Sequence, residues 1–389
     1  MNSNLEACHI RKIPALRLTA AVLCGRIEKG KCLRKYEESQ MKHDRRKAAA
    51  VLAALTLAVL PGCSSGKTEN LDQGMALVEQ LEYEEALNSF EAAVLNGEDA
   101  QLAYRGMGLA YMGLSQYDSA VSSLQRALSY SDERPDQLDY DINYYLATAY
   151  YKQGNLDGAK SVYESIIALR PKEKTAYYLK GVIELAQGDM EAASADFDTA
   201  VSIDPQDYDL RIDIFCSCAE NGQQELGQGY LQTVLDDEDS KLSDYNRGRM
   251  NYYLGNYDTA RNALESAMDT DSSSEVVSLL GQTYEQLGDY NYAASVYNNY
   301  LSQTPDARIY NQLGLCDLRI GDYEAALTAF QSGIAMEGNQ IMQTLRFNEI
   351  VAYEYLGQFD QARLKMEEYL ALYPDDTKAQ REYEFLQTR

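Results

Sequence analysis

One phrase returns along this chain about every 34 residues, and that period constrains the fold more than any other feature of the sequence. In its clearest copy the repeated spacing joins two glycines, two tyrosines, an alanine and a further aromatic residue: Gly281, Tyr284, Gly288, Tyr290, Ala293 and Tyr297. A second copy reads Gly108, Tyr111, Tyr117, Ala120, Leu124 and Ala127. A fixed period of this length is typical of stacked helix pairs, in which each repeat contacts only its neighbours.

Each position of the phrase has a physical reason. Small residues on the first helix and alanines on the second allow two helices to approach closely. The glycine before the second helix permits a sharp turn. Prolines follow several of the second helices, which they cannot continue: Pro205, Pro305 and Pro374. Because each pair leaves an apolar face that only another pair can bury, the repeats must stack.

On these residues the chain resembles the tetratricopeptide repeat family, whose unit is a pair of antiparallel helices. The resemblance implies an all-α fold: a right-handed superhelical solenoid of about nine helix-turn-helix repeats over residues 70–376, closed by a capping helix at residues 377–389. The repeats are expected at about 67–100, 101–139, 140–173, 174–207, 208–240, 241–273, 274–306, 307–342 and 343–376.

The fifth of these repeats departs most from the phrase. Gly227 stands where the second helix of other repeats has alanine, and Gly222 and Gly229 lie in the same helix pair. Glycine inside a helix costs about 1 kcal/mol relative to alanine. We therefore expect a softer joint at residues 216–240, which would divide the array into two stiffer arms.

The residues ahead of the array have the layout of a secretory signal peptide, expected at residues 41–62. After Met41 come four basic side chains, Lys42, Arg45, Arg46 and Lys47. An apolar run over residues 48–60 follows, which is too short to span a bilayer comfortably.

The run ends in Leu60-Pro61-Gly62-Cys63, which resembles the lipobox of bacterial lipoproteins. The resemblance implies that Cys63 carries a diacylglycerol group and becomes the first mature residue, so that residues 63–69 form a lipidated cysteine and a short tether. The protein would then be anchored to the extracytoplasmic face of the cell membrane by two acyl chains. The alternative is a short buried helix with an ordinary cysteine. Residues 1–40 fit no targeting pattern ahead of such a signal, so we expect a non-native extension upstream of a true start at Met41.

Charge is spread unevenly along the chain. Residues 1–62 contain 12 Lys or Arg and 5 Asp or Glu, a net charge of +7, so the remaining residues carry −32 of the total of −25. An acidic body of this kind repels phosphate backbones, so we expect no nucleic-acid partner.

Histidine occurs only at His9 and His43, ahead of the expected processing site. The mature chain would therefore lack histidine-dependent nucleophilic catalysis and histidine-ligated metal sites. Cys216, Cys218 and Cys316 are expected to be small buried core residues. We expect no enzymatic activity, cofactor, metal or small-molecule substrate.

The resemblance places a ligand on the first helices of the repeats. Carried onto this sequence, it gives a groove rich in tyrosine, a side chain that offers a rigid apolar face and a polar tip. The expected groove residues are Tyr144, Tyr151, Tyr178, Tyr245, Arg249, Tyr252, Asn311 and Arg319. The alternative for any single tyrosine is packing between helices.

Two functions remain open at this point. The first is a membrane-anchored extracytoplasmic scaffold that binds a peptide or a partner protein through the superhelix. The second is an accessory subunit of a cell-envelope assembly or secretion complex.

Overall fold

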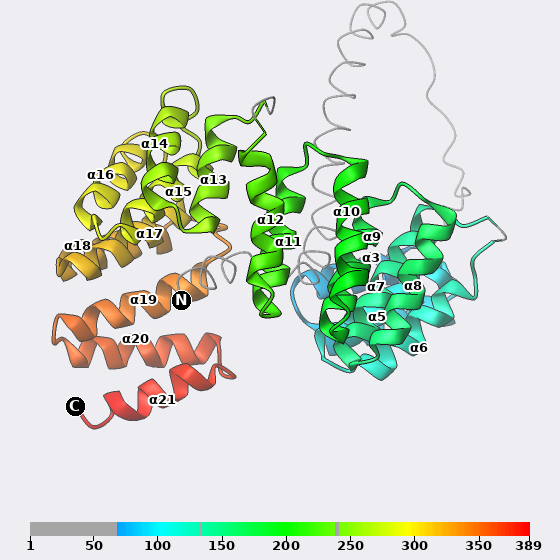
Figure 1. The fold of residues 1–389 in the computed structure, drawn as a ribbon. Coiled ribbons are helices and arrows are strands. Elements are labelled where there is room, and N and C mark those ends of the chain that lie inside the picture. Colours follow the sequence, from blue (N-terminus) through cyan, green and yellow to red (C-terminus); the bar gives the residue numbers. More distant parts are fainter. Residues whose placement is uncertain (1–67, 133, 238–240) are drawn as a thin grey trace, which may run out of the picture. The chain divides into compact units, whose positions relative to one another are not determined.

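A computed structural model describes residues 68–132, 134–237 and 241–389, and every regular element in those ranges is an α-helix (Figure 1). The all-α fold expected from the sequence is confirmed for this part of the chain. The expected signal peptide, Cys63 and residues 1–40 lie outside the described residues.

The helices alternate between a first helix (A) and a second helix (B) of each pair. The A helices are α3 (Glu69–Glu79), α5 (Ala100–Gly113), α7 (Gln137–Gln153), α9 (Lys174–Gln187), α11 (Tyr208–Glu220), α13 (Asp244–Leu254), α15 (Ser274–Gln286), α17 (Ala307–Ile320) and α19 (Met342–Tyr355). The B helices are α4 (Tyr83–Leu95), α6 (Tyr117–Leu128), α8 (Leu156–Leu169), α10 (Met190–Ile203), α12 (Gln224–Leu235), α14 (Tyr257–Met268), α16 (Tyr290–Leu301), α18 (Tyr323–Ile334) and α20 (Phe359–Leu372). A last helix, α21 (Thr377–Leu386), buries Ala379 and Leu386.

Glycines in the left-handed conformation form most of the turns between the A and B helices. Gly154, with φ of +84°, caps α7, and its backbone N–H donates to the Tyr151 carbonyl at 3.0 Å. Side chains other than glycine rarely adopt such a φ, which explains the glycine of the repeated phrase. In the first two pairs Leu81 and Ser115 take the same conformation, with φ of +65° and +58°.

In several pairs, an aromatic side chain on helix B packs closely against a glycine of helix A. A Cβ atom added to Gly181 of α9 would lie 2.6 Å from the ring of Phe197 on α10, and one added to Gly314 of α17 would lie 2.5 Å from Phe330 on α18. Both rings are fully buried. The small residue of helix A is therefore needed because the ring of helix B occupies the place of its side chain.

Neighbouring pairs are joined by a recurring hydrogen bond between a B helix and a tyrosine of the next A helix. Gln125 donates to the Tyr150 hydroxyl at 2.7 Å, and Gln331 donates to the Tyr353 hydroxyl at 3.1 Å. The Tyr284 hydroxyl donates to Glu265 in the same arrangement. Tyrosine is thus the aromatic that both packs and hydrogen-bonds between pairs, which suits a chain with 32 tyrosines and no tryptophan.

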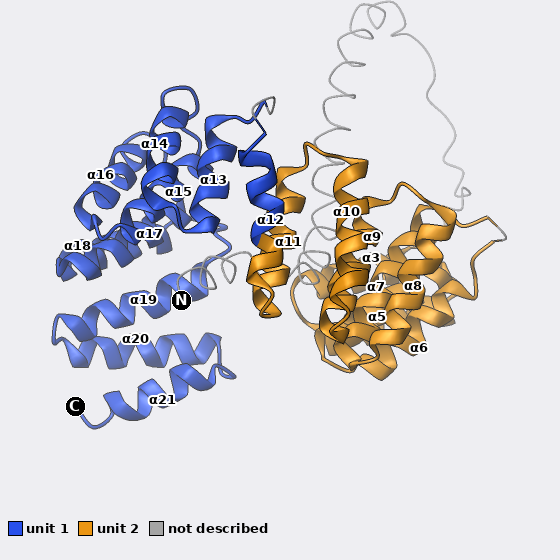
Figure 2. Cartoon of the chain, in the orientation of Figure 1, with its two compact units in different colours: residues 1, 228–389 blue, residues 2–227 orange. Residues whose placement is uncertain are grey.

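The chain divides into two compact units, one ending at Gly227 and the other beginning at Gln228 (Figure 2). We call them the N-terminal unit and the C-terminal unit. The division falls within residues 216–240, where the sequence predicts a softer joint. The softness of that joint stays a prediction.

Gly227 is a tight packing position. Helix α12 passes so close to α11 that a Cβ atom on Gly227 would lie 2.9 Å from Phe215 Cα and 2.9 Å from Cys218 Cβ. An added Cβ on Gly229 would have nothing within 4 Å. The two glycines therefore have different roles: Gly227 is required by a close approach of two backbones, whereas Gly229 is not.

Candidate functional site

Two of the expected groove tyrosines are packing residues in the structure. Tyr178 of α9 is 5% exposed, and its hydroxyl lies 2.9 Å from the Ser217 hydroxyl on α11. Its ring centroid lies 6.0 Å from that of Phe197. Burial raises the pKa of Tyr178 well above its usual value. Tyr252 of α13 is 4% exposed and packs edge-on against Tyr257, so neither side chain offers much surface to a ligand.

Tyr144 and Tyr151 of α7 are both half-buried. The Tyr144 ring centroid lies 6.1 Å from that of Tyr163 on α8, and burial raises the pKa of the Tyr144 hydroxyl. These two tyrosines retain some exposed surface, but they belong to the N-terminal unit, whereas the other groove candidates except Tyr178 belong to the C-terminal unit.

Arg249 of α13 is 8% exposed, and its guanidinium lies 5.2 Å from the centre of the half-buried Tyr245 ring. It also donates to Asn246 Oδ1 at 3.1 Å. The pair is thus a cation–π contact along one helix. Arg319, at the end of α17, is by contrast exposed.

Asn311 of α17 is half-buried, and its Oδ1 atom accepts a hydrogen bond of 2.8 Å from Asn348 Nδ2 on α19. This contact joins two A helices across one repeat. It belongs to a set of polar contacts that the groove prediction did not contain.

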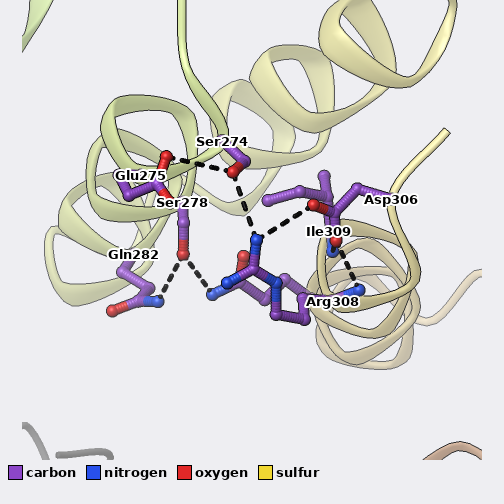
Figure 3. Close-up of polar contacts among 8 residues, drawn as sticks. Ser274, Glu275, Ser278, Gln282, Asp306, Arg308 and Ile309 are labelled. Atoms are coloured by element: carbon purple, nitrogen blue, oxygen red, sulfur yellow. Dashed lines mark hydrogen bonds and ion pairs between the residues drawn. The ribbon is translucent and has the colours of Figure 1, made fainter. Parts of the chain in front are cut away.

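The densest part of that set joins α15 and α17 in the C-terminal unit (Figure 3). Ser278 Oγ accepts hydrogen bonds from Gln282 Nε2 at 3.0 Å and from Gln312 Nε2 at 2.8 Å. Nearer the start of the helices, one guanidinium nitrogen of Arg308 donates to Ser274 Oγ at 3.2 Å and to Asp306 at 3.1 Å.

We call this surface the amide face, after the side chains that dominate it. It comprises Ser274, Ser278, Gln282, Arg308, Asn311, Gln312 and Asn348. All are half-buried except Arg308, which is 63% exposed. Gln312 Oε1 is buried and has no hydrogen-bond partner. The face therefore presents polar groups that are held in place and still have hydrogen-bonding capacity.

Helices α5 and α7 of the N-terminal unit are joined by charged contacts instead. Gln101 of α5 donates to Asp139 of α7 at 2.7 Å, and Arg105 Nε donates to Asp141 Oδ2 at 2.6 Å. The Arg105 guanidinium also lies 5.3 Å from the centre of the Tyr145 ring. The contacts between α5 and α7 thus differ chemically from those between α15 and α17.

A sequence signal for these contacts exists. Their partners are separated by about one repeat length: 34 residues for Ser278–Gln312, 36 for Arg105–Asp141 and 37 for Asn311–Asn348. Pairs of polar residues on A helices at that spacing could have indicated the amide face. The groove prediction missed it because it was based on the positions of tyrosines.

The described residues contain no cluster of His, Cys, Asp and Glu side chains suited to a metal ion. Cys216, Cys218 and Cys316 are buried free thiols, as expected from the sequence. Burial raises the pKa of Cys218 to about 12, so its thiol stays protonated at neutral pH.

Sequence profiles of the tetratricopeptide repeat match residues 71–137, 144–208, 245–307, 278–339 and 347–376, which together are well over half of the chain. The chain belongs to the tetratricopeptide repeat family. Repeats of this family generally bind proteins or peptides. No curated protein matches the sequence.

Among solved structures, the chain is similar to a tetratricopeptide repeat protein from Parabacteroides merdae, with 17% identity, a TM-score of 0.39 and coverage of 65% of this chain and 98% of the other. It is similar to YrrB, described as a tetratricopeptide protein with an unusual peptide-binding site (15% identity, TM-score 0.32, coverage 57% and 97%). It is also similar to PilW, a type IV pilus biogenesis factor (18% identity, TM-score 0.34, coverage 54% and 99%). Similarity at this level does not extend to function.

Proposed function

We propose that this tetratricopeptide array is an interaction scaffold that binds a peptide or a partner protein through the A helices of its repeats, without catalysing a reaction. The observation that carries the proposal is the amide face, where half-buried polar side chains on successive A helices are fixed by one another. Such preorganised groups lose little conformational freedom when a ligand binds.

The proposal includes an anchor at Cys63 on the extracytoplasmic face of the cell membrane. Its support is the sequence from Met41 to Cys63, with its basic start, apolar run and lipobox-like ending. None of the helices that the structure describes combines the length and hydropathy needed to cross a bilayer.

Anchoring is tested by comparing the unaltered protein with the Cys63→Ala variant, both expressed from the full 389-residue reading frame. We expect the unaltered protein to fractionate with membranes and to yield no peptides from residues 1–62, whereas the variant loses lipid-dependent retention. Mass spectrometry of the mature N-terminus measures both. Mature protein that begins at residue 1, or wild-type and variant protein with the same fractionation, would contradict the anchor.

Binding is tested by affinity capture with the full chain from detergent-extracted membranes. In the comparison variant, arginine replaces Asn311 and Gln282 and blocks the amide face by its bulk and charge. We expect the wild-type chain to capture a defined partner, and the Asn311→Arg, Gln282→Arg variant to lose it while keeping its melting temperature. Recovery of an integral membrane complex would identify the scaffold as an accessory subunit of an envelope assembly. Equal capture by both proteins would show that the binding site does not lie on the A helices of the C-terminal unit.

A further inference from the structure

The amide face differs from an ordinary charged surface because some of its side-chain amide groups have no hydrogen-bond partner among the residues that the structure describes. Gln282 and Gln312 each donate one side-chain N–H to Ser278, which leaves the Oε1 atom of Gln282 unbonded, whereas Oε1 of Gln312 is buried. Asn311 accepts through Oδ1, which leaves its N–H₂ group, and Asn348 donates through Nδ2, which leaves its Oδ1 atom. The face therefore presents both acceptors and donors of amide type.

The internal hydrogen bonds also determine the orientation of these groups. Ser278 Oγ accepts from two amides at once, so it holds Gln282 from its own helix and Gln312 from the next A helix. The Asn311–Asn348 bond extends the same arrangement to α19. An amide side chain whose one end is fixed presents its other end in a defined direction.

Amide groups that both donate and accept are complementary to the peptide unit itself. An extended chain advances about 3.3 Å per residue, and packed helices lie about 10 Å apart, so one repeat corresponds to about three residues of an extended ligand. The charged side chains at the start of this face are already engaged: Arg308 is paired with Asp306, and Glu275 accepts a hydrogen bond of 3.1 Å from Ser274.

Resting on the proposed function, we infer that the amide face of α15, α17 and α19 binds an extended polypeptide through its main chain, with little dependence on its side chains. The ligand's N–H groups donate to Gln282 and Asn348, and its carbonyl groups accept from Asn311, while Gln312 holds Ser278 in place from below. Between α5 and α7 of the N-terminal unit the corresponding contacts are an ion pair and a carboxylate–amide pair, which leave fewer free amide groups.

The inference is tested with fluorescent 12-residue peptides that are uncharged, blocked at both ends and of one composition in three scrambled orders. A fourth peptide has one of these sequences with every second backbone nitrogen methylated. Binding to the full chain is measured by fluorescence anisotropy. We expect the three orders to bind within about threefold of one another, and N-methylation to weaken binding at least tenfold, because it removes half of the main-chain donors.

Two variants localise the effect. The double variant Ser278→Ala, Asn311→Ala removes the hydroxyl that holds both glutamines and the unbonded N–H₂ group of Asn311. It should weaken binding at least tenfold. Gln331→Ala is the matched control, because it removes an amide that also bridges two helices of the C-terminal unit but lies on a B helix. Melting temperatures of both variants show that the fold is retained.

Equal binding of the N-methylated peptide, strong preference for one scrambled order, or no binding of any peptide would overturn main-chain recognition. Loss of binding in Gln331→Ala to the same extent as in the double variant would also overturn it. If a protein partner is still captured and its capture still requires the A helices, the proposed scaffold function is supported even though main-chain recognition has failed. Failure of the inference can therefore be distinguished from failure of the proposed function.

Discussion

Buried carboxylates show at the residue scale how this fold depends on pH. Glu354 of α19 has a buried Oε1 atom without a hydrogen-bond partner. Burial, together with the nearby Glu382 carboxylate, raises the pKa of Glu354 to about 7. Since this pKa is above the ordinary value of an unfolded glutamate, the folded state binds the proton more tightly, and stability falls as pH rises from about 4.5 to 7.

Glu354→Gln removes this ionisation. We expect the variant to melt about 2 °C higher than the wild-type protein at pH 8, and to show little difference at pH 4.5, where the wild-type side chain is protonated in the folded state and about half protonated in the unfolded state. Thermal unfolding at the two pH values measures this, with the exposed Glu384→Gln as the control. A difference that is independent of pH would mean that Glu354 is not the titrating group.

Individual residues also show the limit of sequence reasoning about the site. Tyr178 and Tyr252 stand at positions where the family places ligand contacts, but the structure buries both. A tyrosine on an A helix can face a ligand or the next A helix, and which occurs depends on how close that helix lies. For Tyr178 the deciding partner is Ser217, one repeat further on, and the spacing within a single repeat carries no information about it.

At the scale of the element, the helix pair was readable from the sequence. The glycine and tyrosine of the turn appear as Gly288 and Tyr290, and α16 begins at Tyr290. The sequence pattern could not distinguish the two helical glycines of the fifth pair, one tightly packed and one not. In the sequence, Gly227 stands where other repeats have alanine and is expected only to weaken the helix. In the structure, the backbone of α11 leaves no room for a Cβ atom there.

Gly227→Ala and Gly229→Ala are therefore expected to act in opposite directions. The added methyl at Gly227 collides with α11 and should destabilise the protein by about 1–3 kcal/mol. At Gly229 it meets open space and should stabilise α12 by up to about 1 kcal/mol, because alanine is the better helix former. Urea unfolding measures both, and stabilisation by Gly227→Ala would contradict the close approach.

At the scale of the whole molecule, the division between Gly227 and Gln228 falls within the joint expected from the sequence. In an array whose repeats contact only their neighbours, a weak pair lowers local stability without unfolding the rest. We expect hydrogen exchange to be faster in residues 216–237 than in α9 or α17. Equal protection across all of these segments would show that the fifth pair is as stable as the others.

The central claim is that this chain binds another polypeptide through the A helices of its C-terminal unit. It is tested most directly by placing a photo-crosslinking amino acid singly at Gln282, Asn311, Tyr292 and Leu95, then irradiating the full chain in its native membranes. Tyr292 and Leu95 are exposed residues of B helices and serve as controls. We predict a common crosslinked partner from Gln282 and Asn311 and none from the two controls; crosslinks from Tyr292 or Leu95 alone would contradict the claim.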